Sequence, residues 1–153
     1  SDCHRIFTSS AGGPKNGTFR SPIVENPFNF SKLCNYEFHA TDNERVMIMF
    51  TGFNLRGSPP DCSREYLDIY AELTSKDQSP IESPFGGRYC ARSIPHTRVS
   101  LYQTLELSFH TTFPEVGEDA FEGTFEFIDA SKSQLLLRSL TMICRRTYQP
   151  FSL

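Results

Sequence analysis

The sequence predicts an all-β domain, a sandwich or a barrel, that two disulfides hold together. Apolar and polar residues alternate with a period of two in several short segments, and helical periodicity is almost absent. Clusters of Gly, Pro, Asn and Asp separate these segments. Four of the five cysteines lie in the first 130 residues. This combination is typical of a secreted β domain.

Four of the five expected strands have one apolar face and one polar face. In Thr104–His110, for example, Leu105, Leu107 and Phe109 alternate with Glu106, Ser108 and His110. The other three strands of this kind are Tyr36–Ala40, Tyr66–Ala71 and Phe121–Ile128. Arg45–Phe53 differs because Met47 and Met49 make its second face apolar, so we expect a central strand covered on both sides.

Length and charge indicate one domain with a short extension. The 153 residues are too few for two ordinary domains. The net charge of −3 gives no reason to expect nucleic acid as a partner. Residues 131–153 contribute +4 and leave −7 for the remainder. We therefore assign residues 1–129 to the domain and residues 130–153 to a basic tail, either disordered or a short helix around Leu135–Ile143.

The cysteines and two glycosylation sequons favour an extracellular location. Cys3, Cys34, Cys62 and Cys90 can form two disulfides in three ways, and Cys144 is then left over within the chain. The sequons begin at Asn16 and Asn29. No stretch reaches the roughly 18 consecutive apolar residues of a membrane span.

Several segments between Cys3 and Ile128 resemble the CUB domain family. They are Asn16–Pro22, Cys34–Phe38, Cys62–Tyr70, Gly86–Cys90, Leu105–Phe109 and Phe121–Phe125. The resemblance implies a two-sheet antiparallel β-sandwich, jelly-roll-like, with disulfides Cys3–Cys34 and Cys62–Cys90. Within the family, Pro59–Tyr70 and Pro84–Cys90 are most similar to suppressor-of-lurcher-like and neuropilin/tolloid-like membrane proteins. Those proteins are auxiliary proteins of ionotropic receptors.

Many CUB domains bind calcium through three acidic side chains at one end of the sandwich. Carried over from the resemblance, those positions fall near Arg56, at Glu65 and near Thr112, so only Glu65 is acidic. An arginine about 5 Å from a divalent ion costs roughly 6 kcal/mol at an effective dielectric of about 20. We therefore expect no bound metal and no cofactor. An alternative metal set consists of Asp61, Glu65, Glu118 and Asp119.

The sequence predicts a binding module and not an enzyme. The four histidines show no metal-binding spacing, and the common hydrolase and phosphate-binding motifs are absent. Candidate residues for contact with a partner are Arg56, Arg64, Tyr66, Arg88 and Arg92. The expected function is extracellular protein–protein interaction, in a membrane-bound auxiliary protein of ionotropic receptors. Two alternatives are a non-catalytic exosite domain of a secreted protease and a single-domain, spermadhesin-like glycan-binding protein.

Overall fold

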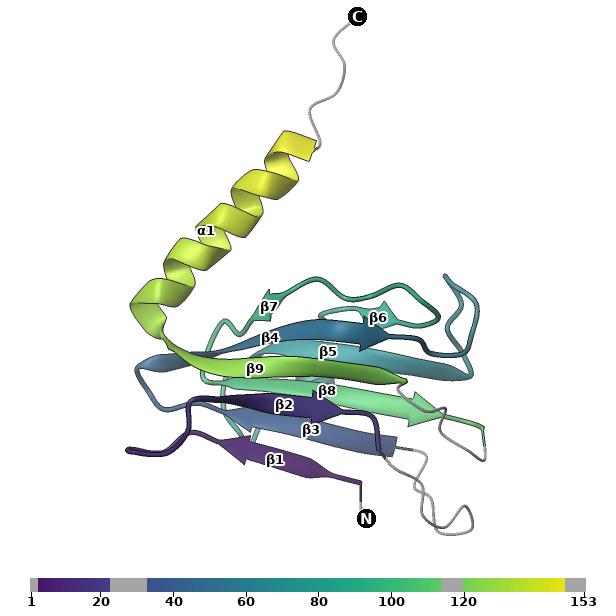
Figure 1. Ribbon diagram of the computed structural model, residues 1–153, viewed down its shortest axis with the longest axis horizontal. Helices are drawn as coiled ribbons and strands as arrows, with labels where there is room; N and C mark the ends of the chain where they lie inside the picture. Colours follow the sequence, from purple (N-terminus) through teal and green to yellow (C-terminus); the bar gives the residue numbers. More distant parts are fainter. Residues whose placement is uncertain (1–2, 23–32, 114–119, 148–153) are drawn as a thin grey trace, which may run out of the picture.

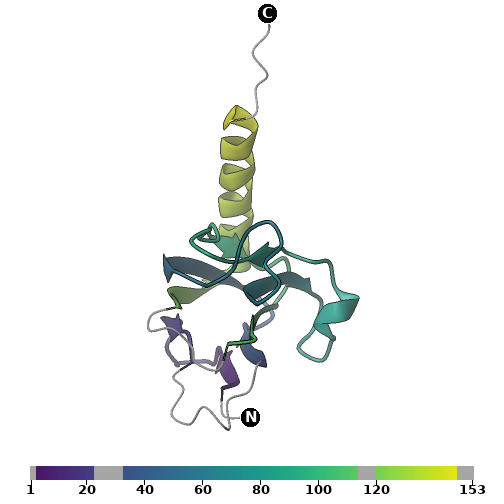
Figure 2. The same cartoon turned by 90° about the vertical axis from the view of Figure 1, so that its right-hand side faces the viewer.

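A computed structural model describes residues 3–22, 33–113 and 120–147, and two β-sheets packed face to face form its body (Figures 1 and 2). One sheet has five strands in the order β1-β3-β8-β5-β6 and the other has four in the order β2-β9-β4-β7. The five are β1 (Arg5–Thr8), β3 (Leu33–His39), β8 (Thr104–Thr111), β5 (Glu65–Leu73) and β6 (Arg88–Tyr89). The four are β2 (Asn16–Arg20), β9 (Phe121–Asp129), β4 (Glu44–Phe53) and β7 (Arg98–Val99). The predicted β-sandwich is confirmed.

Neighbouring strands run antiparallel, with one exception among the described pairs. β1 lies parallel to β3, with Arg5 opposite Tyr36. Two disulfides, Cys3–Cys34 and Cys62–Cys90, are the pairing that the family resemblance implied. The first joins the residues before β1 to β3, and the second joins the loop before β5 to the residue after β6. Both disulfides therefore stabilise the five-stranded sheet.

Aromatic side chains from both sheets form the centre of the core. The Phe38 side chain is fully buried. Its ring centroid lies 5.0 Å from that of Phe7, 5.6 Å from that of Phe19 and 5.2 Å from that of Phe125. Phe7 and Phe38 belong to the five-stranded sheet, whereas Phe19 and Phe125 belong to the four-stranded sheet. The inward positions of the alternating pattern thus meet between the layers.

The expectation that β4 is covered on both sides is wrong. Val46 and Ile48 are buried against the other sheet, but Met47 is only half-buried and Met49 is 45% exposed. A sandwich has only two layers, so a strand in the middle of one sheet still has one face in water. The apolar outer face of β4 is therefore a surface feature.

A helix, α1 (Ala130–Thr147), follows β9 directly and is longer than the short segment expected around Leu135–Ile143. Asp129 caps its start, because its carboxylate accepts a hydrogen bond from the Ser131 amide at 2.9 Å. Neither Gly nor Pro interrupts the helix. Beyond Ser133, which is buried, the helix projects away from the sandwich (Figures 1 and 2). No helix within the described residues is long and apolar enough to cross a membrane.

Two phenylalanines provide a matched test of this core. We expect Phe38→Ala to lower the free energy of unfolding by about 3–5 kcal/mol, because it leaves a cavity among three aromatic rings. Phe85→Ala should change the free energy of unfolding by no more than about 0.5 kcal/mol, because Phe85 is 57% exposed. Urea unfolding of both variants measures the difference. Equal losses would contradict the assignment of Phe38 to the centre of the core.

Candidate functional site

The carboxylate of Glu65 lies at one end of the sandwich and is almost completely buried, with 1% of the side chain exposed. Its Oε2 accepts hydrogen bonds from the Arg56 guanidinium at 2.8 Å and from the Thr111 hydroxyl at 2.7 Å. Its Oε1 accepts one from the Arg56 backbone amide at 2.9 Å. The protein's own side chains therefore neutralise and solvate this carboxylate.

Two guanidinium groups contact the Phe113 ring next to this ion pair. The guanidinium carbon of Arg56 lies 3.8 Å from the ring centroid, and that of Arg64 lies 4.1 Å from it. Both contacts have cation–π geometry. Phe113 thus brings two guanidinium groups together beside the Glu65 carboxylate.

The described residues at this end do not fit a calcium ion. Glu65 is paired with Arg56, and Asp61 is exposed and accepts a hydrogen bond from Ser63 at 2.9 Å. Glu118 and Asp119, the other members of the alternative metal set, lie outside the described residues. No group of three or more His, Cys, Asp or Glu side chains in the described part of the chain is placed to hold a metal ion.

A second cluster lies on the outer face of the five-stranded sheet. Arg88 on β6 donates two hydrogen bonds to the buried carboxylate of Asp68 on β5, at 2.8 and 2.9 Å. Its guanidinium carbon lies 3.7 Å above the Tyr66 ring. The Tyr66 ring also stacks on the imidazole ring of His110 on β8, with 4.8 Å between the two centroids. Asp68 thus fixes the position of an exposed arginine above a stack of two rings.

Exposed apolar side chains extend this stack toward the sheet edge. Phe85 is 57% exposed, and its ring centroid lies 5.8 Å from that of Tyr70. Arg88 lies 6.0 Å from the Phe85 ring. We call the five residues Tyr66, Tyr70, Phe85, Arg88 and His110 the aromatic–arginine cluster. It combines an anchored cation with exposed ring surface, the composition that protein interfaces favour.

The structure places four of the five predicted contact residues in these two groups. Arg56 and Arg64 meet at Phe113, and Tyr66 and Arg88 meet in the aromatic–arginine cluster. Arg92 is exposed in the turn after Cys90. Four residues that complete the two groups were not predicted as contact residues from the sequence, namely Asp68, Phe85, His110 and Phe113. Strand alternation places Asp68 and His110 on outer faces, but only the pairing of β5 with β8 shows which residues are neighbours.

A pair of glutamates occupies adjacent positions on the same outer face. Glu37 on β3 lies opposite Glu106 on β8, and Glu106 also lies opposite Tyr70 on β5. Glu106 is buried, although the alternating pattern predicted that it faces water. Burial and, to a smaller extent, the Glu37 charge raise the pKa of Glu106 from 4.5 to about 7. His39 lies 2.9 Å from the Glu37 carboxylate.

Comparison with known proteins agrees with this architecture. The family model described as "CUB domain" matches residues 9–125. Cubilin of Sus scrofa is 30% identical over 94 residues, which is 61% of this chain and 2% of cubilin. The dorsal-ventral patterning protein tolloid of Drosophila melanogaster is 27% identical over 136 residues, covering 87% of this chain and 12% of tolloid. The chain therefore spans only a small part of these relatives.

Solved structures show the same fold. The full extracellular region of zebrafish Gpr126/Adgrg6 superposes with a TM-score of 0.61 at 20% identity, covering 84% of this chain and 15% of that one. The MASP-1 CUB2 domain bound to Ca²⁺ superposes with a TM-score of 0.53 at 19% identity, covering 80% and 96%. This chain belongs to the CUB domain family. CUB domains are non-catalytic modules, typically extracellular, that bind other proteins.

Removal of Arg56 tests the role of its ion pair. We expect Arg56→Ala to lower the free energy of unfolding by about 3 kcal/mol, because a buried Glu65 charge loses its partner. This loss is at the low end of the range for buried ion pairs, because 40% of the Arg56 side chain is exposed. Water can therefore enter in its place and partly solvate the Glu65 carboxylate. Urea unfolding measures the loss, with the exposed Arg92→Ala as the matched control. Equal effects in the two variants would contradict the role of Arg56 as counter-charge.

The stability of the protein should depend on pH through Glu106. A carboxyl group whose pKa is raised on folding stabilises the folded state below pH 4.5, and this contribution is lost as the pH rises through about 7. Glu106→Gln should therefore raise the free energy of unfolding at pH 8 by up to about 3 kcal/mol and leave it unchanged at pH 4. Urea unfolding at both pH values measures this, and the exposed Glu72→Gln is the control. A Glu106→Gln effect independent of pH would contradict the assignment.

Proposed function

We propose that this chain is the extracellular protein-binding module of a membrane-bound auxiliary protein of ionotropic receptors. We further propose that it contacts its partner through the aromatic–arginine cluster. One observation supports both statements. The two segments most similar to suppressor-of-lurcher-like and neuropilin/tolloid-like modules, Pro59–Tyr70 and Pro84–Cys90, contain four of the five residues of the cluster: Tyr66, Tyr70, Phe85 and Arg88.

The chemistry of the cluster suits a protein partner. Arginine and tyrosine are enriched among residues that contribute most to binding free energy. Asp68 holds the Arg88 guanidinium in one geometry before binding, so less side-chain entropy is lost when a partner arrives. The exposed Phe85 ring adds apolar area beside this fixed charge. A partner surface with a carboxylate next to apolar side chains complements this arrangement.

The Arg56–Glu65 pair supports binding that does not depend on calcium. The guanidinium of Arg56 supplies the positive charge that Glu65 needs, so no ion is required to order this end of the sandwich. Addition of millimolar Ca²⁺ to chelated protein should therefore leave the melting temperature unchanged, because a ligand that does not bind the folded state gives no stabilisation. Differential scanning calorimetry measures this. An increase of several degrees would contradict the proposal.

Affinity capture tests the partner. The tagged, secreted domain is incubated with detergent-solubilised neuronal membranes, with and without calcium, and bound proteins are identified by mass spectrometry. We expect recovery of an ionotropic receptor in both conditions. Arg88→Ala should lose most of the captured receptor and Arg92→Ala should retain it, because only Arg88 belongs to the cluster. Equal capture by these two variants would reject the cluster as the contact surface.

A protease exosite is the second candidate function, and the relatives give it specific support. One of them, named zinc metalloproteinase nas-39, of Caenorhabditis elegans, is 33% identical over 64 residues, which is 40% of this chain and 7% of the relative. Capture of proteases or matrix proteins without any receptor would favour this function. Capture of glycans alone would favour a spermadhesin-like protein.

A further inference from the structure

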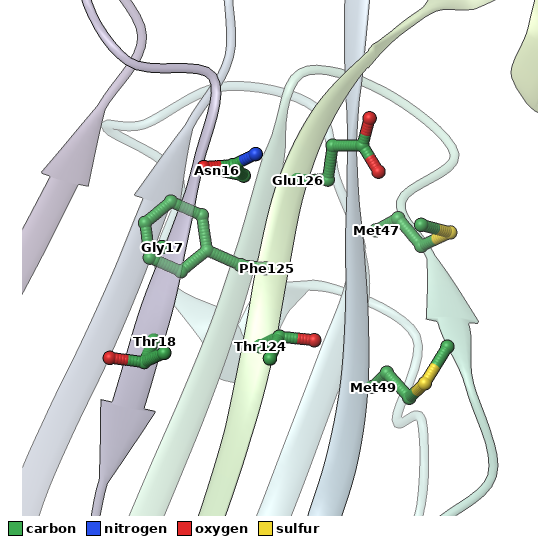
Figure 3. A pocket seen from close by; sticks show the side chains of 8 residues that line it. All are labelled: Asn16, Gly17, Thr18, Met47, Met49, Thr124, Phe125 and Glu126. Atoms are coloured by element: carbon green, nitrogen blue, oxygen red, sulfur yellow. The ribbon is translucent and has the colours of Figure 1, made fainter.

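The outer face of the four-stranded sheet carries a groove of about 420 Å³ across β2, β9 and β4 (Figure 3). It is lined by Asn16, Gly17, Thr18, Met47, Met49, Thr124, Phe125 and Glu126. Most of these side chains form two rows across the strands. Asn16 lies opposite Glu126, which lies opposite Met47. In the next row Thr18 lies opposite Thr124, which lies opposite Met49.

Between the two rows, Gly17 on β2 lies opposite Phe125 on β9, and both belong to the inward face of the sheet. A Cβ atom at Gly17 would lie 2.7 Å from the Phe125 ring, so a side chain cannot be added without displacing that ring. The side of the groove formed by β4 is apolar, because Met49 is 45% exposed and Met47 is half-buried. Polar groups on β2 and the exposed Met49 on β4 form a surface suited to an amphipathic ligand such as a sugar.

A glycan attached to Asn16 would be such a ligand, bound covalently to the chain itself. It begins the sequon Asn16-Gly17-Thr18, and its side chain is exposed at the rim of the groove. We propose that Asn16 carries an N-linked glycan whose first two sugars lie in this groove and cover Met49. The inference depends on the extracellular location of the domain but not on the identity of its protein partner.

The dimensions and chemistry of the groove agree with this occupant. Two strand spacings of about 4.8 Å separate β2 from β4, and Met49 lies one row, about 7 Å, along the strands from Asn16. The sugars must therefore span about 12 Å, a distance comparable to two linked pyranose rings. Sugar hydroxyls can exchange hydrogen bonds with Thr18, Thr124 and Glu126. The C–H face of the second ring can pack on the thioether of Met49.

Oxidation of Met49 reports whether the glycan covers it. The chain is secreted from eukaryotic cells with Asn29→Gln in every variant, so that Asn16 is the only remaining sequon. Peptide mass spectrometry first determines whether Asn16 carries a glycan. The folded protein is then treated with dilute hydrogen peroxide, and conversion of Met49 to the sulfoxide is timed against added N-acetylmethionine amide. We expect oxidation several-fold slower in the glycosylated protein than in Asn16→Gln.

Two controls separate the glycan from the substitution. Thr18→Ser keeps the sequon and should keep both the glycan and the protection of Met49. Removal of the sugars from the folded glycoprotein by an endoglycosidase that leaves only the first one should restore fast oxidation without changing the sequence. An unmodified Asn16 would overturn the proposal. So would a glycan on Asn16 combined with equal oxidation of Met49 in the glycosylated and Asn16→Gln proteins.

Discussion

The buried carboxylate of Glu65 constrains one whole end of the sandwich. Its partners come from both layers, because Arg56 follows β4 of the four-stranded sheet and Thr111 ends β8 of the five-stranded sheet. A buried anion without these donors would cost several kcal/mol. The sheets must therefore approach each other closely enough to supply them. The disulfide between Cys62, in the loop before β5, and Cys90, after β6, restricts the backbone that leads into Glu65.

The two outer faces of the sandwich differ in chemistry. The five-stranded sheet presents an arginine anchored over stacked rings, which suits a protein surface. The four-stranded sheet presents a groove with a glycosylation sequon at its rim and the exposed Met49 across it. Face-to-face packing turns these two surfaces in opposite directions. A glycan on Asn16 would therefore leave the aromatic–arginine cluster open to a partner.

Local patterns in the sequence were sufficient to locate the strands but not to predict which strands lie next to each other. Alternation located β8 and β9, and the family resemblance supplied both disulfides. Alternation also placed Glu106 in water, which is wrong, because its burial depends on the pairing of β8 with β3 and β5. For the same reason, the stacking of the Tyr66 ring on His110 could not be predicted from the sequence. Pairing between distant strands is set by the whole fold and leaves no local pattern.

The ion pair between Arg56 and Glu65 holds this end of the sandwich together without a bound ion. A bound ion orders its loops only when its free concentration is high enough, whereas the Arg56 guanidinium is present in every molecule. The pair itself is neutral, and Arg64 lies beside Arg56 on the Phe113 ring. The aromatic–arginine cluster is built in the same way: the buried Asp68 carboxylate neutralises Arg88, so the proposed contact surface also needs no bound ion to fix its geometry.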